Sequence, residues 1–149
     1  MLTTLLATGV ITLTLAGGPS VETPARRTIN ILPTGGFPTA AQQLGTAEVM
    51  DFLLDLTSLL DADERFASIE LRVAAASQLQ GFELLQSPPY APVVVENGQV
   101  RVWPTIDPAN RTEARWQKGQ PCQIEVTAVT TSVPPRTWQG TAQITAVKK

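Results

Sequence analysis

The chain has no histidine, one cysteine and few aromatic residues, and these shortages exclude many kinds of active site. Its 149 residues include no His, a single Cys (Cys122) and only 5% aromatic residues. Without histidine, the chain cannot form a Ser-His-Asp triad, a Cys-His pair or a His-ligated metal site, and one cysteine cannot form an intrachain disulfide. We therefore expect a protein that is not an enzyme and has no cofactor and no metal site.

Charge of either sign is also scarce. Charged residues make up 16% of the chain, apolar residues make up 43%, and the net charge is −2. This composition is typical of a globular protein and not of a disordered polyelectrolyte or a basic nucleic-acid-binding protein. A chain of this length buries roughly two-thirds of its surface on folding. We expect one domain, residues 1–149, with no membrane partner and no specific nucleic-acid partner.

The N-terminus is apolar but lacks the basic residues of a signal peptide, because the first Lys or Arg is Arg26. Within residues 10–16, isoleucine and leucine alternate with threonine. Such alternation is typical of a strand with one buried face. The sequence therefore predicts strands at residues 2–6 and 10–16 in place of a cleaved leader.

Strand periodicity recurs along the rest of the chain. The expected strands cover residues 28–32, 68–73, 93–95, 100–103, 122–128 and 138–146. Asn97 and Gly98 stand between two valine-rich runs, which predicts a β-hairpin with a type I′ turn. The pattern predicts a mainly β (α+β) fold: an antiparallel β-sandwich or partly open barrel of short strands with one amphipathic helix.

The single helix is predicted at about residues 46–60. Thr46 stands where an N-cap residue is expected. At about 100° per residue, the apolar side chains that follow fill a stripe of about 120°, and Met50 and Leu54 widen it to about 220°. Either the loop at residues 33–45 covers this extra flank, or another subunit packs against it.

Motifs for phosphate binding, acyl transfer and calcium binding are missing from the sequence. The glycines form no GxGxxG or Walker loop, and no serine stands in a GxSxG elbow. The acidic run Asp61, Asp63 and Glu64 lacks the glycine and the distant glutamate of a calcium loop. We expect this run to be a solvated turn whose side chains cap the local backbone.

Acidic and basic residues are segregated along the chain. Residues 48–70 carry seven acidic residues and one basic residue, whereas residues 101–149 carry seven basic and three acidic residues. Opposite charges on two parts of a small protein can orient its copies, or different partners, against one another. We therefore expect these segments to contribute to contacts between subunits.

The strand-first N-terminus ITLTLAGGPS and the terminal strands CQIEVTAVTT and TWQGTAQITAVKK resemble those of small structural proteins of tailed-bacteriophage virions, such as tail, neck, baseplate or decoration proteins. The resemblance implies a protein of the virion, assembled in the bacterial cytoplasm, that binds copies of itself or other virion proteins by subunit packing and strand addition, without turnover. The interface candidates come from the helix flank, the edge strands and the C-terminal tail: Met50, Leu54, Ile11, Leu13, Ile144, Lys148 and Lys149.

An alternative interpretation rests on the tryptophans. Trp103 and Trp116, with Arg115 and Lys118 beside the second of them, combine aromatic faces with positive charge, which can stack on sugars or bases. This pattern is consistent with a secreted or surface β-sandwich module that binds a glycan or another ligand. Trp103 also falls on an alternating strand, where a core position is expected. The exposure of the tryptophans distinguishes the two interpretations.

Overall fold

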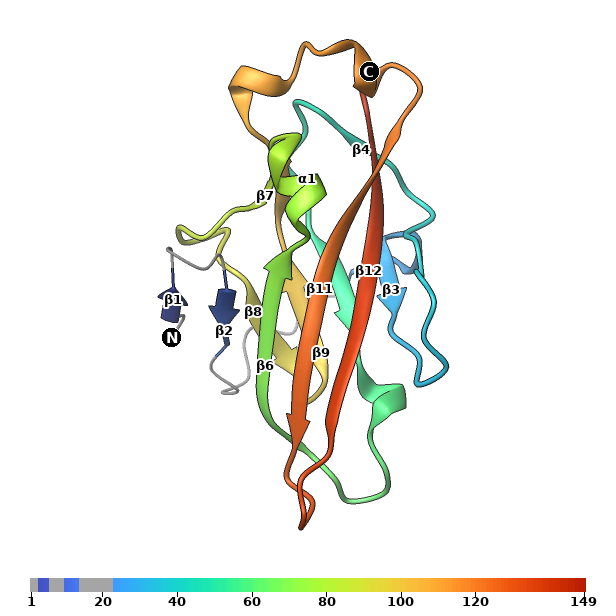
Figure 1. Ribbon diagram of the computed structural model, residues 1–149, viewed down its shortest axis with the longest axis vertical. Helices are drawn as coiled ribbons and strands as arrows, with labels where there is room; N and C mark the ends of the chain where they lie inside the picture. Colours follow the sequence, from blue (N-terminus) through green and yellow to red (C-terminus); the bar gives the residue numbers. More distant parts are fainter. Residues whose placement is uncertain (1–2, 6–9, 14–22) are drawn as a thin grey trace.

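The protein is described by a computed structural model that covers residues 3–5, 10–13 and 23–149 (Figure 1). Strands account for 44% of the chain and helices for 13%, so the predicted mainly β fold is confirmed. The strands are β1 (Thr3–Leu5), β2 (Val10–Thr12), β3 (Thr28–Asn30), β4 (Leu44–Gly45), β5 (Phe52–Asp55), β6 (Phe66–Val73), β7 (Phe82–Leu84), β8 (Val93–Glu96), β9 (Gln99–Val102), β10 (Pro104–Ile106), β11 (Gln120–Thr130) and β12 (Thr137–Val147). The helical elements are α1 (Ala75–Leu79) and the 3₁₀ turns η1 (Ala25–Arg27), η2 (Thr57–Leu59), η3 (Pro108–Asn110) and η4 (Ala114–Trp116).

Two sheets carry the fold, and a small pair of strands joins them. The large sheet has the order β1-β2-β6-β11-β12-β4, the second sheet has the order β3-β5-β9-β8, and β7 pairs with β10. Most neighbours are antiparallel, but β12 pairs with β4, and β3 with β5, in parallel. The sheets are therefore mixed and not purely antiparallel as predicted. Their arrangement is consistent with a sandwich or partial barrel.

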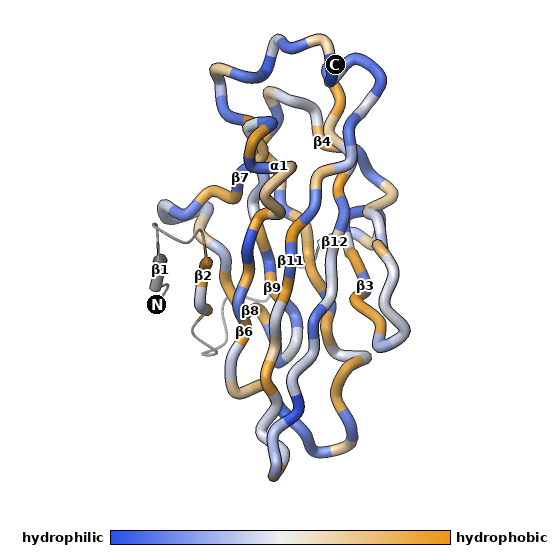
Figure 2. The backbone as a smooth tube through the Cα atoms, viewed as in Figure 1, coloured by the Kyte–Doolittle hydropathy of each residue, from blue (hydrophilic) through white to orange (hydrophobic). Residues whose placement is uncertain are grey.

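The core lies between the two sheets and is built by strand alternation. Over residues 122–130 of β11 and 142–147 of β12, every second residue is buried, and the residues between them are partly exposed. Figure 2 shows this as alternating apolar and polar colour along both strands. The buried side chains of β11 and β12 join those of β5 and β9 in one hydrophobic cluster. One side of the large sheet thus faces the core, and the other is its outer face.

The predicted helix at residues 46–60 is wrong. This segment forms strand β5, which lies between β3 and β9, and the 3₁₀ turn η2. Phe52, Leu53 and Leu54 are all buried because β5 is an inner strand of its sheet. A continuous apolar run fits a doubly covered strand and a helix equally well, and the pairing with β3 and β9 decides between them. No α-helix follows Thr46 for it to cap, and its backbone N–H donates to the Val147 carbonyl over 3.1 Å.

The α-helix of the described residues is α1, five residues within a segment whose pattern fits either a strand or a helix. Its Ser77 is buried, and the Ser77 hydroxyl accepts a hydrogen bond from the Gln123 backbone N–H over 2.9 Å. This contact fixes α1 to β11. In the part of the chain that the structure describes, no helix is long and apolar enough to cross a bilayer.

The hairpin predicted around Asn97 and Gly98 is present as β8–β9, but its turn is not of type I′. Only Gly98 has a positive φ, of 91°, and the register shifts between Val94 and Glu96. A bulge therefore takes up the twist that a second left-handed residue would supply. A Cβ at position 98 would lie 3.0 Å from the Thr57 side chain, so both backbone geometry and packing favour glycine there.

The two predicted N-terminal strands are present as β1 and β2, which pair antiparallel with each other. Strand β2 also pairs with β6, so the N-terminal segment extends the large sheet. The remainder of the predicted second strand, residues 14–16, lies outside the described residues. Ile11 and Leu13 point into the core, as their alternation with threonine predicts.

Segregated charges along the sequence pair with each other inside the chain. The guanidinium Nε of Arg101 lies 3.3 Å from Asp51 Oδ2, and the Lys149 ammonium lies 2.8 Å from Glu48 Oε1. A third such pair joins Arg136 to Asp61 over 3.0 Å. The acidic and basic segments thus hold distant parts of one chain together, and the expectation that they also orient copies stays a prediction.

Because β5 is an inner strand, two Leu-to-Ala substitutions should differ greatly in their effect on the free energy of unfolding. Leu54→Ala should lower the free energy of unfolding by about 2–5 kcal/mol, because it leaves a cavity in the core. Leu79→Ala is the matched control: Leu79 lies on α1 with its side chain 85% exposed, and we expect a change within about 0.5 kcal/mol. Urea denaturation of both variants measures the difference. Equal effects would contradict the inner position of Leu54.

Candidate functional site

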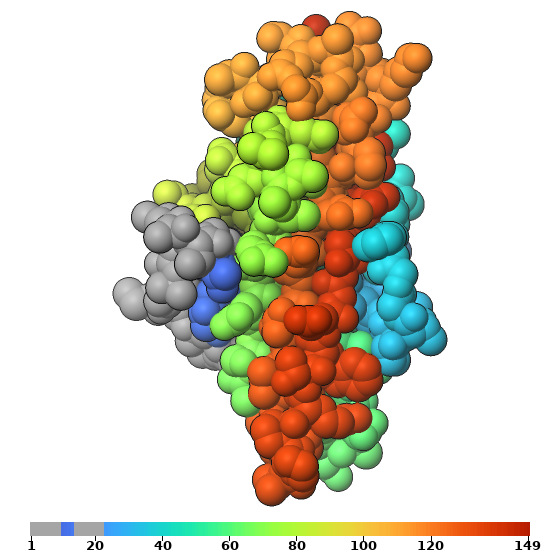
Figure 3. All heavy atoms as spheres, in the orientation of Figure 1, coloured from blue at the N-terminus to red at the C-terminus, as the bar shows by residue number. Residues whose placement is uncertain are grey.

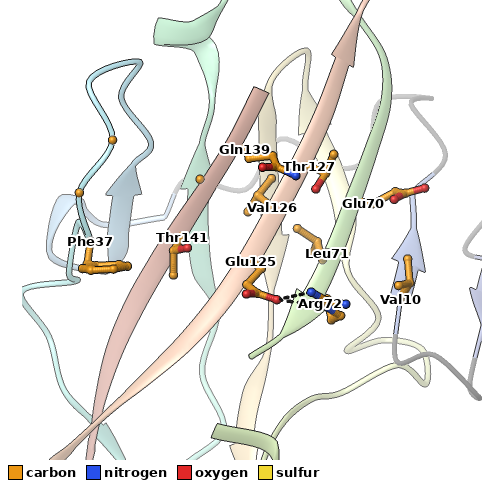
Figure 4. A pocket seen from close by; sticks show the side chains of 13 residues that line it. Val10, Phe37, Glu70, Leu71, Arg72, Glu125, Val126, Thr127, Gln139 and Thr141 are labelled. Carbon is orange, nitrogen blue, oxygen red and sulfur yellow. Dashed lines mark hydrogen bonds and ion pairs between the residues drawn. The ribbon is translucent and has the colours of Figure 1, made fainter. Parts of the chain in front are cut away.

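The outer face of the large sheet carries a hollow of about 640 Å³. Its floor is formed by β6, β11 and β12, and its two sides by Val10 of β2 and by the loop at residues 35–37 (Figure 4). Figure 3 shows this face in front, with β2 on one side and the loop that follows β3 on the other. Its volume lies within the range of about 300–1,000 Å³ in which proteins bind small ligands.

Two rows of polar side chains cross the floor. In one row Arg72, Glu125 and Thr141 are direct cross-strand neighbours. In the other row Glu70, Thr127 and Gln139 are neighbours in the same way. Because adjacent strands lie about 4.8 Å apart, each row sets three polar groups in a line across the sheet. The floor offers hydroxyl, amide, carboxylate and guanidinium groups to a ligand.

The first row is ordered by an ion pair. Arg72 donates from Nε to Glu125 Oε1 over 2.9 Å, and its Nη2 lies 2.9 Å from the same oxygen. The two side chains are 57% and 41% exposed, so solvent screens the pair and it adds little to stability. The ion pair instead fixes where the guanidinium and the carboxylate lie over the floor, as Figure 4 shows.

An exposed aromatic ring stands at one side of the hollow. The side chain of Phe37 is 63% exposed, and Gly35 and Gly36 before it have φ of 82° and 89°. The chain after the ring is fixed to β12, since the Gln143 N–H donates to the Pro38 carbonyl over 2.9 Å. The ring therefore projects from a tethered turn and is not part of the core.

A second, shallower hollow lies at the tip of the β11–β12 hairpin and contains the acidic run. Its lining includes Asp61, Glu64 and Arg136. The Arg136 guanidinium donates to Glu64 Oε2 over 3.2 Å and contacts Oε1 as well. This contact, with the Asp61 backbone N–H, lowers the pKa of Glu64 to about 2. The predicted solvated turn is thus anchored by an ion pair from the hairpin.

Cys122 is buried, and burial raises the pKa of its thiol to about 12. Such a thiol stays protonated at neutral pH and is a poor nucleophile. Among the residues that the structure describes, no three His, Cys, Asp or Glu side chains gather so as to hold a metal ion.

The predicted apolar interface residues lie inside this chain. Leu54 and Ile144 are fully buried, and Ile11 and Leu13 are nearly so. Ile11, Leu13 and Ile144 face the core by strand alternation, and Leu54 is buried because β5 is an inner strand. Met50 alone is half-buried, and the Gln42 amide donates to its sulfur over 3.2 Å. The uncovered helix flank assigned to Met50 and Leu54 does not exist.

The two C-terminal lysines are exposed, at the end of the molecule opposite the hairpin tip (Figure 1). The Lys148 backbone N–H donates to the Trp116 carbonyl over 2.9 Å, which fixes the tail to η4. Lys149 lowers the pKa of Glu48 through their hydrogen bond. Both lysines remain interface predictions.

The tryptophan set does not form the exposed surface that the alternative interpretation requires. Trp116 is fully buried, and its indole N–H donates to the Asn110 carbonyl over 2.8 Å. Trp103 is half-buried and makes an edge-to-face contact with Tyr90, with ring centroids 5.1 Å apart. A stacking role for Trp116 is therefore wrong, because the η3–η4 segment folds over the ring.

Arg115 and Lys118, the charged members of the set, are exposed on either side of the buried Trp116. The Arg115 guanidinium contacts the carboxylate of Glu113, which offsets its charge. The residues that line the hollow on the outer face were not predicted from the sequence. Their only signal there is a polar residue at every second position of β6, β11 and β12. That pattern is common to all strands with a solvent-facing side.

Comparison of the chain with protein-family models, with curated proteins and with solved structures finds no match.

The Glu64–Arg136 contact predicts a defined pH dependence. The folded-state pKa of Glu64, about 2, lies below its ordinary value of 4.5. The contribution to stability is therefore complete above pH 4.5 and is lost as the pH falls toward 2. Glu64→Gln should destabilise the protein at pH 7, and its difference from the unmodified protein should shrink between pH 5 and pH 3. Urea denaturation across this range measures it.

Glu96→Gln is the control for this test, since Glu96 is an exposed carboxyl at the end of β8. We expect it to change stability little at any of these pH values. A Glu64→Gln effect that stays constant from pH 7 to pH 3 would contradict the proposed ion pair.

Proposed function

We propose that this protein is a structural assembly subunit of a tailed-bacteriophage virion, which acts by strand addition between copies and not by turnover. The observation that carries this proposal is the position of β2 at the N-terminal side of the large sheet. Strand β2 and the residue that follows it contribute two buried side chains, those of Ile11 and Leu13, to the core of the sandwich. A segment that supplies core residues from near a sheet edge can supply them equally well to a neighbouring copy.

Few backbone contacts hold β2 against β6. Three residues pair with β6, from Val10 opposite Arg72 to Thr12 opposite Glu70, and the Leu13 N–H donates to the Ile69 carbonyl over 3.0 Å. Every copy carries the same β2 and the same side of β6 that pairs with it. Exchange between copies therefore preserves each of these contacts. The contacts therefore do not favour the intrachain pairing over the pairing between copies.

Chain length permits the exchange. Nine residues, 14–22, connect the described part of β2 to the rest of the protein. A segment of nine residues can reach at most about 30 Å when extended. This reach is enough to place a terminal strand on the sheet edge of an adjacent small domain.

A disulfide test distinguishes exchange from intrachain pairing. The Leu13–Ile69 hydrogen bond makes Thr12 and Glu70 a non-hydrogen-bonded pair, whose Cα atoms lie about 4.5 Å apart, within disulfide range. We would refold Thr12→Cys and Glu70→Cys chains together, one carrying a mass tag, and oxidise the mixture. Strand addition between copies predicts a covalent heterodimer on a non-reducing gel.

Each single variant oxidised alone is the control for random cross-linking, and the double variant reports whether the disulfide geometry is accessible. Cys122 should not interfere, because it is buried. If only the double variant forms a disulfide, and does so within a monomer, strand addition between copies is wrong. Light scattering of the unmodified protein should show an oligomer that persists at moderate salt. The buried side chains of the exchanged segment, Ile11 and Leu13, are apolar, and salt screens charges.

A further inference from the structure

We propose that the hollow on the outer face of the large sheet binds a neutral oligosaccharide, with Phe37 as the stacking surface. The hollow lies on the face opposite the core, and its floor residues belong to β6, β11 and β12. This proposal is argued apart from the assembly function: Val10 of β2 lies at one side of the hollow, but the argument rests on Phe37 and on the outward side chains of β6, β11 and β12.

The charge of the floor selects against a polyanion. Glu70 and Glu125 are negative, Arg72 is the basic residue among those that line the hollow, and Glu125 already engages it over 2.9 Å. The lining therefore carries one excess negative charge. A phosphate backbone or a sulfated chain would meet repulsion there, and an uncharged ligand would not.

Over β6 and β11, the backbone of the floor selects against an extended peptide. Strands β6 and β11 each pair with a neighbour on both sides within the large sheet. Their N–H and C=O groups are engaged in the ladder and offer nothing to an added strand. Recognition over these two strands must come from side chains that project outward.

Those side chains match the groups of a sugar. Thr127 and Thr141 bring hydroxyls, Gln139 brings an amide, and Glu125 brings a carboxylate, all on adjacent strands in direct register. Each can donate to or accept from a ligand hydroxyl. A pyranose ring also has an apolar C–H face, which the exposed ring of Phe37 at the side of the hollow can cover.

The first experiment is a titration of the isotope-labelled full chain with neutral hexasaccharides, followed by NMR. Cellohexaose, maltohexaose, chitohexaose and mannohexaose would be added singly to millimolar concentration, with a heparin hexasaccharide as the polyanionic comparison. We expect at least one neutral probe to shift the amide signals of residues 35–37, 70–72, 125–127 and 139–141. Binding of the heparin probe alone, or no shift with any neutral probe, would overturn the proposal.

Two variants test the assignment of the site. Phe37→Ala should weaken binding of the selected hexasaccharide about tenfold by removing the stacking surface, and Thr127→Val should weaken it by removing one hydroxyl at nearly constant shape. Leu79→Ala is the control, since Leu79 is an exposed apolar residue on α1 and is not part of the hollow. Equal affinity of Phe37→Ala and Leu79→Ala would overturn the role of Phe37.

Discussion

The register of β11 with β6 and β12 is the constraint on which the rest of the structure depends. In this register Ile124 and Val126 face the core, while Glu125 and Thr127 face outward with their neighbours on both sides. A slip of one residue would exchange the two sets and place a carboxylate in the core. The same pairing therefore fixes the core and builds the polar floor of the hollow.

Ion pairs add a second level of organisation by joining segments that are far apart in sequence. Asp51 is the clearest case. It lies beside Arg27 of η1 and Arg101 of β9, and all three side chains are largely buried. Removing one member of such a group leaves the others without compensation, which is costly. The charges thus specify how distant segments meet.

The two proposals use different parts of one scaffold. Strand addition would use the N-terminal side of the large sheet, where β2 and the residue after it supply Ile11 and Leu13 to the core. Ligand binding would use the outer face, through the side chains that project from β6, β11 and β12. Because one depends on backbone pairing and the other on exposed side chains, each can fail without affecting the other.

By itself, the sequence determined the mainly β class, the N-terminal strands and the β8–β9 hairpin, because alternation and turn residues are local signals. Only the tertiary structure decided that residues 52–55 form an inner strand, since an apolar run has no period that separates a helix from a strand covered on both faces. It also decided that Trp116 is buried and that Phe37 stands beside a polar floor. These features depend on which segments meet across the sheets, and cross-strand register is a long-range property that no local pattern specifies.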